Sequence, residues 1–312
     1  MATIVFESLF PVLLVIVIGL GLRKSGIVSQ AHWEGIELLG YWLLIPALVM
    51  VSLIQMDLAS IELSSIVKGY VLAVIIQMSI VWLLRKPLNR YLQINDRSFS
   101  SIFQTATRWN GFIALAIANN LAGDQGLAIV SLIIALTVPI LNVTNVVMMT
   151  VCCSASSPTF SNTLINTLKV PLIWAALAGL VINLWQLPIY EPLIISFDII
   201  GRAGLGVGLL AIGAGLHVRP ALNARAPVLI GVIAKLFVFP LLVFLACRMF
   251  GVDGLALQIA VLSASVSTAS NGYILARQMG GDFDSYAATA SLQIVVCMFS
   301  IPLILWLLSV VT

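Results

Sequence analysis

The sequence predicts an all-α membrane protein with ten transmembrane helices, built as two five-helix halves of opposite membrane topology. Three observations predict this fold. First, 61% of the 312 residues are hydrophobic and 9% are charged, whereas soluble domains carry about 25% charged residues. Second, ten apolar segments approach the roughly 20 residues that cross a bilayer core. Third, an Asn-Gly pair interrupts one segment in each half, at Asn110-Gly111 and Asn271-Gly272.

Each of the ten segments is predicted to be a helix, because none shows the short, alternating pattern of barrel strands. No Lys or Arg precedes Arg23, so the first segment lacks the basic region of a cleaved signal peptide and is expected to be retained. The expected spans are 4–22, 36–56, 64–84, 99–121, 126–150, 170–187, 193–216, 226–249, 254–278 and 286–310.

The two halves repeat each other. We expect a first five-helix repeat over 1–151, a Ser- and Thr-rich connecting loop over 152–168 and a second repeat over 169–312. Landmarks recur in the same order at spacings of 160 to 163 positions: Pro11 with Pro171, Gly19 with Gly179, Gly40 with Gly201, Asn110 with Asn271, and Pro139 with Pro302. Because five is odd, the second copy must enter the membrane from the opposite side, which makes an inverted-topology repeat.

The basic residues predict the orientation, because cytoplasmic loops are enriched in Lys and Arg. Only Lys68 and Arg248 lie in loops on one side of the predicted membrane. Ten basic residues lie on the other side, which is therefore predicted to be cytoplasmic: Arg23, Lys24, Arg85, Lys86, Arg90, Arg97, Lys169, Arg219, Arg225 and Arg277. Both termini are then expected on the non-cytoplasmic side of a bacterial-type inner membrane.

The two Asn-Gly pairs are the strongest functional signal. Gly loses backbone entropy in a helix and Asn competes for backbone hydrogen bonds, so the pair interrupts a helix. In hydrocarbon, such a break is tolerated only where protein or a water-filled cavity satisfies the freed groups. Matching breaks in two halves point to a transporter's substrate site. We therefore predict that Asn110, Gly111, Asn271 and Gly272 line a substrate site where broken fourth and ninth helices cross.

The predicted site favours anions. Half-helix N-termini near Phe112 and Tyr273 would each carry about half a positive charge and free N–H groups. Arg108 lies beside the first break, and a cation at mid-membrane costs ~2.5–3.5 kcal/mol on insertion scales. A carboxylate substrate would offset that cost. Alternatively, Arg108 bonds carbonyls freed at the break or extends to the inner surface.

Further polar residues could line the same cavity. The alternative for all of them is hydrogen bonding between packed helices, which small polar residues commonly provide. The candidates are Ser267, Thr268 and Ser270 in the ninth segment, Asn142 and Asn145 in the fifth, and Gln293 in the tenth.

Two more basic residues lie inside spans. Arg202 is expected to pair with Asp198 one helical turn earlier. Lys235 could reach either the pocket or a carbonyl at a helix end.

Other classes of function are disfavoured. Neither broken segment contains Asp or Glu, so Na⁺ would have to bind carbonyls, hydroxyls and amides alone. His32 and His217 lie at the cytoplasmic ends of segments, and neither an intramembrane Ser with a base beside it nor a pair of membrane Asp residues is found, so an enzyme is not expected. The four cysteines lack metal-type spacing. We predict no cofactor or metal site and no nucleic-acid partner.

The run Arg108-Trp109-Asn110-Gly111-Phe112-Ile113-Ala114-Leu115, together with Asn271-Gly272, resembles the fourth and ninth helices of bacterial members of the auxin efflux carrier family. The resemblance covers the whole chain. It implies a scaffold of helices 1, 2, 6 and 7, often dimeric, and a transport domain of helices 3–5 and 8–10. It also implies elevator-type movement of an anion, commonly a carboxylate, with Asn110 and Asn271 at the crossover.

Two departures matter. Plant members carry proline at the crossover, and here neither break contains it. Their long cytoplasmic loop is also missing. The fold is similar to that of the bile acid:sodium symporters, but their ninth-helix acidic sodium ligand has no counterpart here. We therefore expect a transporter of small organic anions, with membrane lipid and a second copy of the chain as partners. A sodium-coupled symporter of a bile-acid-like or keto-acid anion and a ligand-binding membrane sensor are the alternatives.

Overall fold

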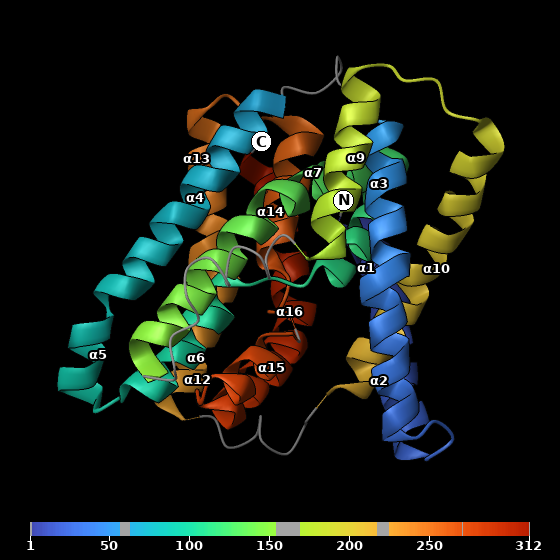
Figure 1. The fold of residues 1–312 in the computed structure, drawn as a ribbon. Helices are drawn as coiled ribbons and strands as arrows, with labels where there is room; N and C mark the ends of the chain where they lie inside the picture. The colour runs from blue at the N-terminus through green and yellow to red at the C-terminus, as the bar shows by residue number, and fades with distance from the viewer. Residues whose placement is uncertain (1, 57–62, 154–168, 217–224, 270, 312) are drawn as a thin grey trace. The chain divides into compact units, whose positions relative to one another are not determined.

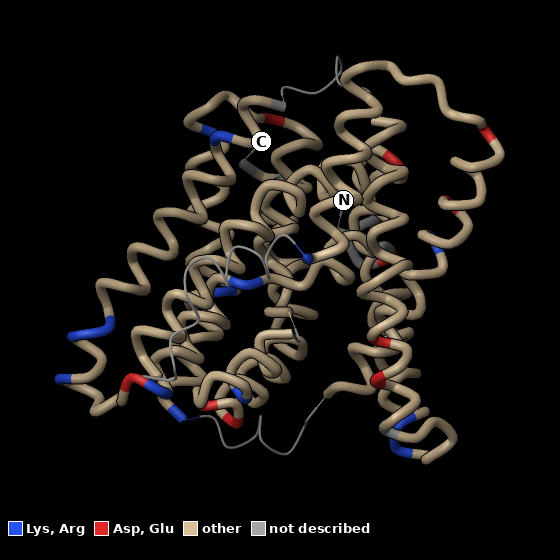
Figure 2. The backbone as a smooth tube through the Cα atoms, in the orientation of Figure 1, with Lys and Arg blue, Asp and Glu red and all other residues tan. Residues whose placement is uncertain are grey.

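The computed structural model describes residues 2–56, 63–153, 169–216, 225–269 and 271–311, and every regular element within these ranges is a helix (Figure 1). Six stretches of the described chain are long and apolar enough to cross a membrane. Charged positions are sparse along the backbone (Figure 2). The all-helical, multi-pass prediction is therefore confirmed.

The helices of the first 153 residues are α1 (Ala2–Lys24), α2 (Gln30–Leu39), the π-helical η1 (Gly40–Leu44), α3 (Ile45–Ile54), α4 (Leu63–Leu83), α5 (Arg85–Leu92), α6 (Asp96–Thr107) and α7 (Gly111–Cys153). The remaining ones are α9 (Pro171–Leu184), α10 (Glu191–Ala214), α12 (Ala226–Ile233), the π-helical η2 (Ala234–Val238), α13 (Phe239–Met249), α14 (Gly254–Ser265), α15 (Asn271–Gln278) and α16 (Phe283–Val311).

The described residues form two compact units. The first unit draws on residues 1–62, 111–136 and 168–216, and the second on 63–110, 137–167 and 217–312. Each unit therefore combines segments from both halves of the sequence.

In the first unit, α1 packs along α10, and α3 packs between α9 and α10 (Figure 1). Glycines permit this close packing, because a Cβ at Gly201 would lie 2.6 Å from the Cα of Leu48. Polar side chains close the helix ends. Asn183 Nδ2 donates to the carbonyl oxygens of Leu53, Ile54 and Met56 at 2.7, 2.9 and 2.7 Å, which caps the C-terminal end of α3.

In the first unit, α7 also contains a sharp turn. Gly123 has a φ of 55° and a ψ of −140°, a backbone conformation that is sterically unfavourable for residues with a Cβ atom. The fourth and fifth predicted segments are therefore joined by a single-residue kink instead of a loop.

In the second unit, α4 packs along α13, and α6 packs against α12 and α16. A hydrophobic cluster packs along α6 from Phe99 to Ala106. Its buried members are Val81, Ile94, Phe99, Ile102, Phe103, Ala106, Met148 and Cys152. This cluster holds α6 in place up to the residue where it breaks.

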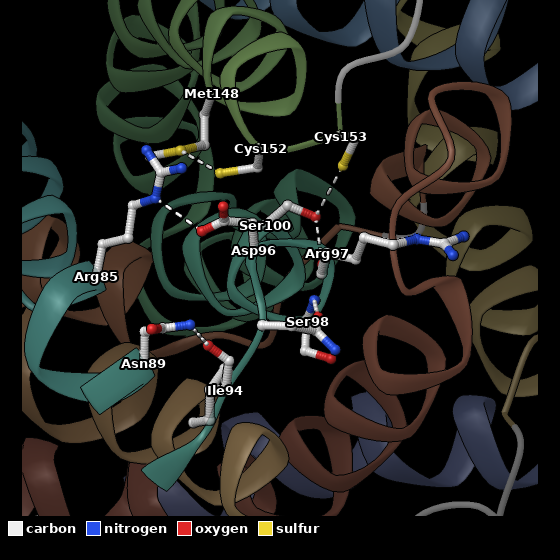
Figure 3. Close-up of polar contacts among 11 residues, drawn as sticks. Arg85, Asn89, Ile94, Asp96, Arg97, Ser98, Ser100, Met148, Cys152 and Cys153 are labelled. Atoms are coloured by element: carbon white, nitrogen blue, oxygen red, sulfur yellow. Dashed lines mark hydrogen bonds and ion pairs between the residues drawn. The ribbon is translucent and has the colours of Figure 1, made fainter. Parts of the chain in front are cut away.

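The short helix α5 was not expected, because its basic residues suggest a loop. An ion pair fixes it to the start of α6, with 2.9 Å between Arg85 Nε and Asp96 Oδ1 (Figure 3). Asn89 Nδ2 also donates to the carbonyl oxygen of Ile94 at 3.1 Å. The Asn95 side chain caps α6 by accepting from the Ser98 N–H at 2.9 Å.

Asp282, between α15 and α16, joins the start of α6 to the start of α16. Its carboxylate accepts from Ser98 Oγ at 2.6 Å, and from the N–H and Oγ of Ser285 at 3.0 and 2.7 Å. Partial burial alone would raise the pKa of this carboxyl. The hydrogen bonds and the nearby charge of Arg97 outweigh burial, so the pKa of Asp282 lies below its ordinary value.

Candidate functional site

The helix breaks predicted at the two Asn-Gly pairs are present. α6 ends at Thr107, Arg108 is extended with a φ of −70° and a ψ of 154°, and α7 begins at Gly111. α14 ends at Ser265, and Val266 is extended with a φ of −76° and a ψ of 161°. α15 begins at Asn271. Each Asn-Gly pair thus lies where its second half-helix starts.

The two extended segments meet in the second unit. The backbone N–H of Asn110 donates to the carbonyl oxygen of Ser267 at 2.9 Å. The backbone N–H of Thr268 donates to Gln293 Oε1 at 2.8 Å. Both bonds satisfy polar groups that a continuous helix would have satisfied internally.

Gln293 serves both breaks at once. Its Nε2 donates to the carbonyl oxygen of Thr105 on α6 at 3.1 Å and to that of Gly231 on α12 at 3.0 Å. Its side chain is fully buried. An amide is well suited here, because it offers an acceptor and two donors from one side chain.

Arg108 lies beside this crossing and is 6% exposed. Its Nη1 is 3.2 Å from Asn142 Oδ1 and 3.4 Å from Asn271 Oδ1. Asn142 is half-buried and Asn271 is exposed. Arg108, Asn142 and Asn271 therefore form one cluster from three separate helix segments, with a positive charge at its centre and an accessible amide at its edge.

Asn145 and Thr268 face inward. Asn145 Nδ2 donates to the Leu141 carbonyl at 2.7 Å and to Thr107 Oγ1 at 3.3 Å, and its side chain is fully buried. Thr268 Oγ1 lies 3.1 Å from the hydroxyl of Tyr286. These contacts favour the helix-packing role for both residues. Ser267 is also fully buried, whereas Ser270 lies outside the described residues.

The two glycines differ in their surroundings. A Cβ at Gly272 would lie 2.6 Å from Cε2 of Tyr286, so this glycine leaves room for the tyrosine ring. A Cβ at Gly111 would lie 3.3 Å from Cδ1 of Ile134, a tight contact with a flexible side chain. Packing against Tyr286 therefore requires glycine at position 272, whereas position 111 could accept a small side chain if Ile134 shifts.

Two residues of the crossing escaped the sequence analysis. Tyr286 donates its hydroxyl to the carbonyl oxygen of Ala269 at 2.5 Å, beside the second break. Gln77 Nε2 donates to the carbonyl oxygens of Ala106 and Ala234 at 3.2 and 2.8 Å. The sequence signal that could have found them is a single polar side chain in an otherwise apolar span, because such a side chain in a membrane helix needs a hydrogen-bond partner.

The other two basic residues considered inside spans, Arg202 and Lys235, also have partners. Arg202 Nε lies 2.8 Å from Asp198 Oδ2, which confirms the expected pair, and its Nη2 lies 2.8 Å from Asp124 Oδ1. Lys235 Nζ donates to the carbonyl oxygen of Ala264 at 2.9 Å, so it reaches a helix-end carbonyl.

Broken apolar helices that meet beside a buried cation are typical of membrane transport proteins. A family profile described as "Membrane transport protein" matches residues 4–156 and 158–305. The chain therefore belongs to this family, the auxin efflux carrier family.

The names of three relatives also describe transporters. "Uncharacterized transporter YfdV" of Escherichia coli (strain K12) is 28% identical over 207 residues, 63% of each chain. "Putative malonate transporter" of Rhizobium meliloti (strain 1021) is 30% identical over 141 residues, 44% of this chain and 43% of the relative. "Uncharacterized transporter" of Methanothermobacter thermautotrophicus is 24% identical over 305 residues, 95% of this chain and 96% of the relative. The match to the Escherichia coli protein thus spans less than two thirds of its length.

Proposed function

We propose that this protein is a secondary or facilitative transporter of small organic anions, with carboxylates as substrates. The observation that carries the proposal is the cluster of Arg108 with Asn142 and Asn271 beside the hydrogen-bonded crossing. A buried guanidinium with an amide at an accessible edge suits a carboxylate, because charge-assisted hydrogen bonds to a carboxylate are stronger than neutral ones. The name of the Rhizobium meliloti relative supports malonate as the first anion to test.

We propose that the anion crosses the membrane by an elevator mechanism, in which a transport domain moves relative to a scaffold. The ten spans would form an inverted repeat of two five-helix halves, 1–151 and 169–312. Helices 1, 2, 6 and 7 would serve as the scaffold and would form the contact of a homodimer. The grouping of α1, α3, α9 and α10 in the first unit supports the scaffold, although this unit also includes residues 111–136 of the fourth and fifth helices. The transport domain would be built from helices 3–5 and 8–10, with both termini outside an inner membrane.

Transport is tested with purified protein reconstituted into proteoliposomes. Radiolabelled malonate should accumulate inside vesicles that contain the protein and be released by excess unlabelled malonate. Uptake that is absent from protein-containing vesicles, while the purified protein still binds malonate, would replace the transporter proposal with a ligand sensor. Uptake that requires an inward Na⁺ gradient would favour the sodium-coupled alternative.

A further inference from the structure

Lys235 is a buried basic residue that the proposed anion site does not use. It lies in η2 and its side chain is 0% exposed. Its ammonium nitrogen contacts the carbonyl oxygen of Ala264 at 2.9 Å and lies 4.4 Å from the centroid of the Phe239 ring. Among the described residues, no carboxylate lies within ion-pair distance of it. An isolated charge in a dry interior is costly, so this cation lacks its natural counter-ion.

The contact places Lys235 at one of the two breaks. Ala264 is the next-to-last residue of α14, and the extended segment that follows supplies Ser267 and Thr268 to the crossing. The carbonyl oxygens at a helix C-terminus attract positive charge. A charge on Lys235 therefore acts on the segment that holds the proposed anion site.

The first half of the sequence solves the same structural problem with a neutral side chain. Gln77 donates to the carbonyl oxygen of Ala106, which is the next-to-last residue of α6. Donor and acceptor are 29 residues apart in both halves. Since an amide is sufficient to cap the broken helix in one half, capping alone does not explain a lysine in the other. What lysine adds is the ability to gain and lose a proton.

The surroundings contain no other group suited to that role. α12 and α14 contain no titratable side chain, and α6 has Asp96 and Arg97 only in its first turn. Of the titratable groups on the other two elements packed against η2, α16 contributes Asp284, Tyr286 and Cys297, and α13 contributes Cys247 and Arg248. At the crossing itself, Arg108 is a permanent cation. An anion bound at the crossing would favour the charged form of Lys235, as an opposite charge does.

We propose that Lys235 carries a coupling proton: its amine takes up one proton from solution when an anion binds at the crossing and releases it when the anion leaves. The inference rests on the proposed transport of anions. The neutral –NH₂ and the charged –NH₃⁺ forms can both donate to Ala264, so the contact persists through the cycle. The bound anion supplies the missing counter-charge. Anion and proton then move together in the same direction.

The test is isothermal titration calorimetry of the purified protein with malonate, in buffers of different ionisation enthalpy, at a pH where malonate is fully ionised. Wild-type protein should take up about one proton per anion. Lys235→Gln, which copies Gln77, should bind malonate with no proton uptake. Lys68→Gln removes an exposed lysine from α4 in the same unit and should behave like wild type.

The outcomes are distinguishable. Binding by wild-type protein without proton uptake, or unchanged proton uptake in Lys235→Gln, would overturn the role of Lys235 and leave anion transport standing. No binding or transport of any carboxylate by wild-type protein would remove the proposed function itself, and the proton role with it. If Lys235→Gln does not fold, Lys235→Arg replaces it. This variant keeps the charge permanently and should also bind malonate without proton uptake.

Discussion

The backbone N–H of Asn110 donates a hydrogen bond to the carbonyl oxygen of Ser267 at 2.9 Å, although the two residues come from opposite halves of the sequence. This bond ties one helix break to the other. It explains why two extended segments can exist within apolar spans, because each supplies a partner that the other lacks. The predictions below address this crossing and the contacts that support it.

Replacing Arg108 with Gln should weaken malonate binding at least about tenfold, because a charge-assisted contact to the carboxylate is lost. The fold should persist, since glutamine can still donate to Asn142 or Asn271. Binding is measured by titration of the purified variant. Arg97→Gln is the control, because Arg97 lies at the start of α6 and contacts the Gly280 carbonyl. Equal affinity in wild type and Arg108→Gln would contradict the anion site.

Gly272→Ala should lower the melting temperature, by on the order of 5 °C, because the added methyl group would collide with the buried ring of Tyr286. The matched control is Gly206→Ala in α10, where a Cβ would meet no atom within 4 Å. That variant should match or exceed wild-type stability, since alanine favours helix. Thermal unfolding in detergent measures both. Similar losses in the two variants would rule out the steric explanation.

Asn183→Leu should destabilise the first unit by roughly 1–3 kcal/mol or more, since the carbonyls of Leu53, Ile54 and Met56 would lose their donor in a buried place. Gln186→Leu, three residues later, removes a partly buried donor to a single carbonyl and should cost less. Chemical unfolding in mixed micelles gives the comparison. Equal losses of unfolding free energy in the two variants would contradict the proposed role of Asn183 as the cap of α3.

Asp282 should make stability depend on pH. Its folded pKa is lowered, so its contribution is fully present above the ordinary Asp value of 3.8 and is lost as the pH falls through the lowered value. Asp282→Asn should therefore be less stable than wild type at neutral pH, and the difference should shrink in acid. Melting temperatures across acidic pH measure this. Asp284→Asn, an exposed neighbour, should show no such convergence.

The sequence predicted the features that depend on local chemistry. Asn-Gly is a helix-breaking pair wherever it occurs, so the breaks before Gly111 and at Asn271 were predictable. The pairing of Arg202 with Asp198 follows from helical spacing alone. The whole-chain resemblance to the auxin efflux carrier family agrees with the family match over 4–156 and 158–305.

Features that depend on tertiary packing were not predictable. Lys235 had two candidate destinations, and only the packing of η2 against α14 selects the carbonyl of Ala264. Tyr286 and Gln77 gave no local signal beyond being polar groups in apolar helices. The helix α5 was missed because its position depends on tertiary contacts: the Arg85–Asp96 ion pair, the hydrogen bond from Asn89 to the Ile94 carbonyl, and the packing of Leu88 against the cluster around α6.

The hydrogen bonds of Gln293 and Gln77 have a consequence for how the chain can be divided. Gln293 reaches the Thr105 carbonyl in the other half, and Gln77 reaches the Ala234 carbonyl in return. Fragments 1–151 and 169–312, produced separately, would each bury carbonyl or amide groups whose partners sit on the missing piece. We therefore expect that the two halves of the sequence do not fold independently, so a split version of this protein would require that both fragments be made in the same membrane.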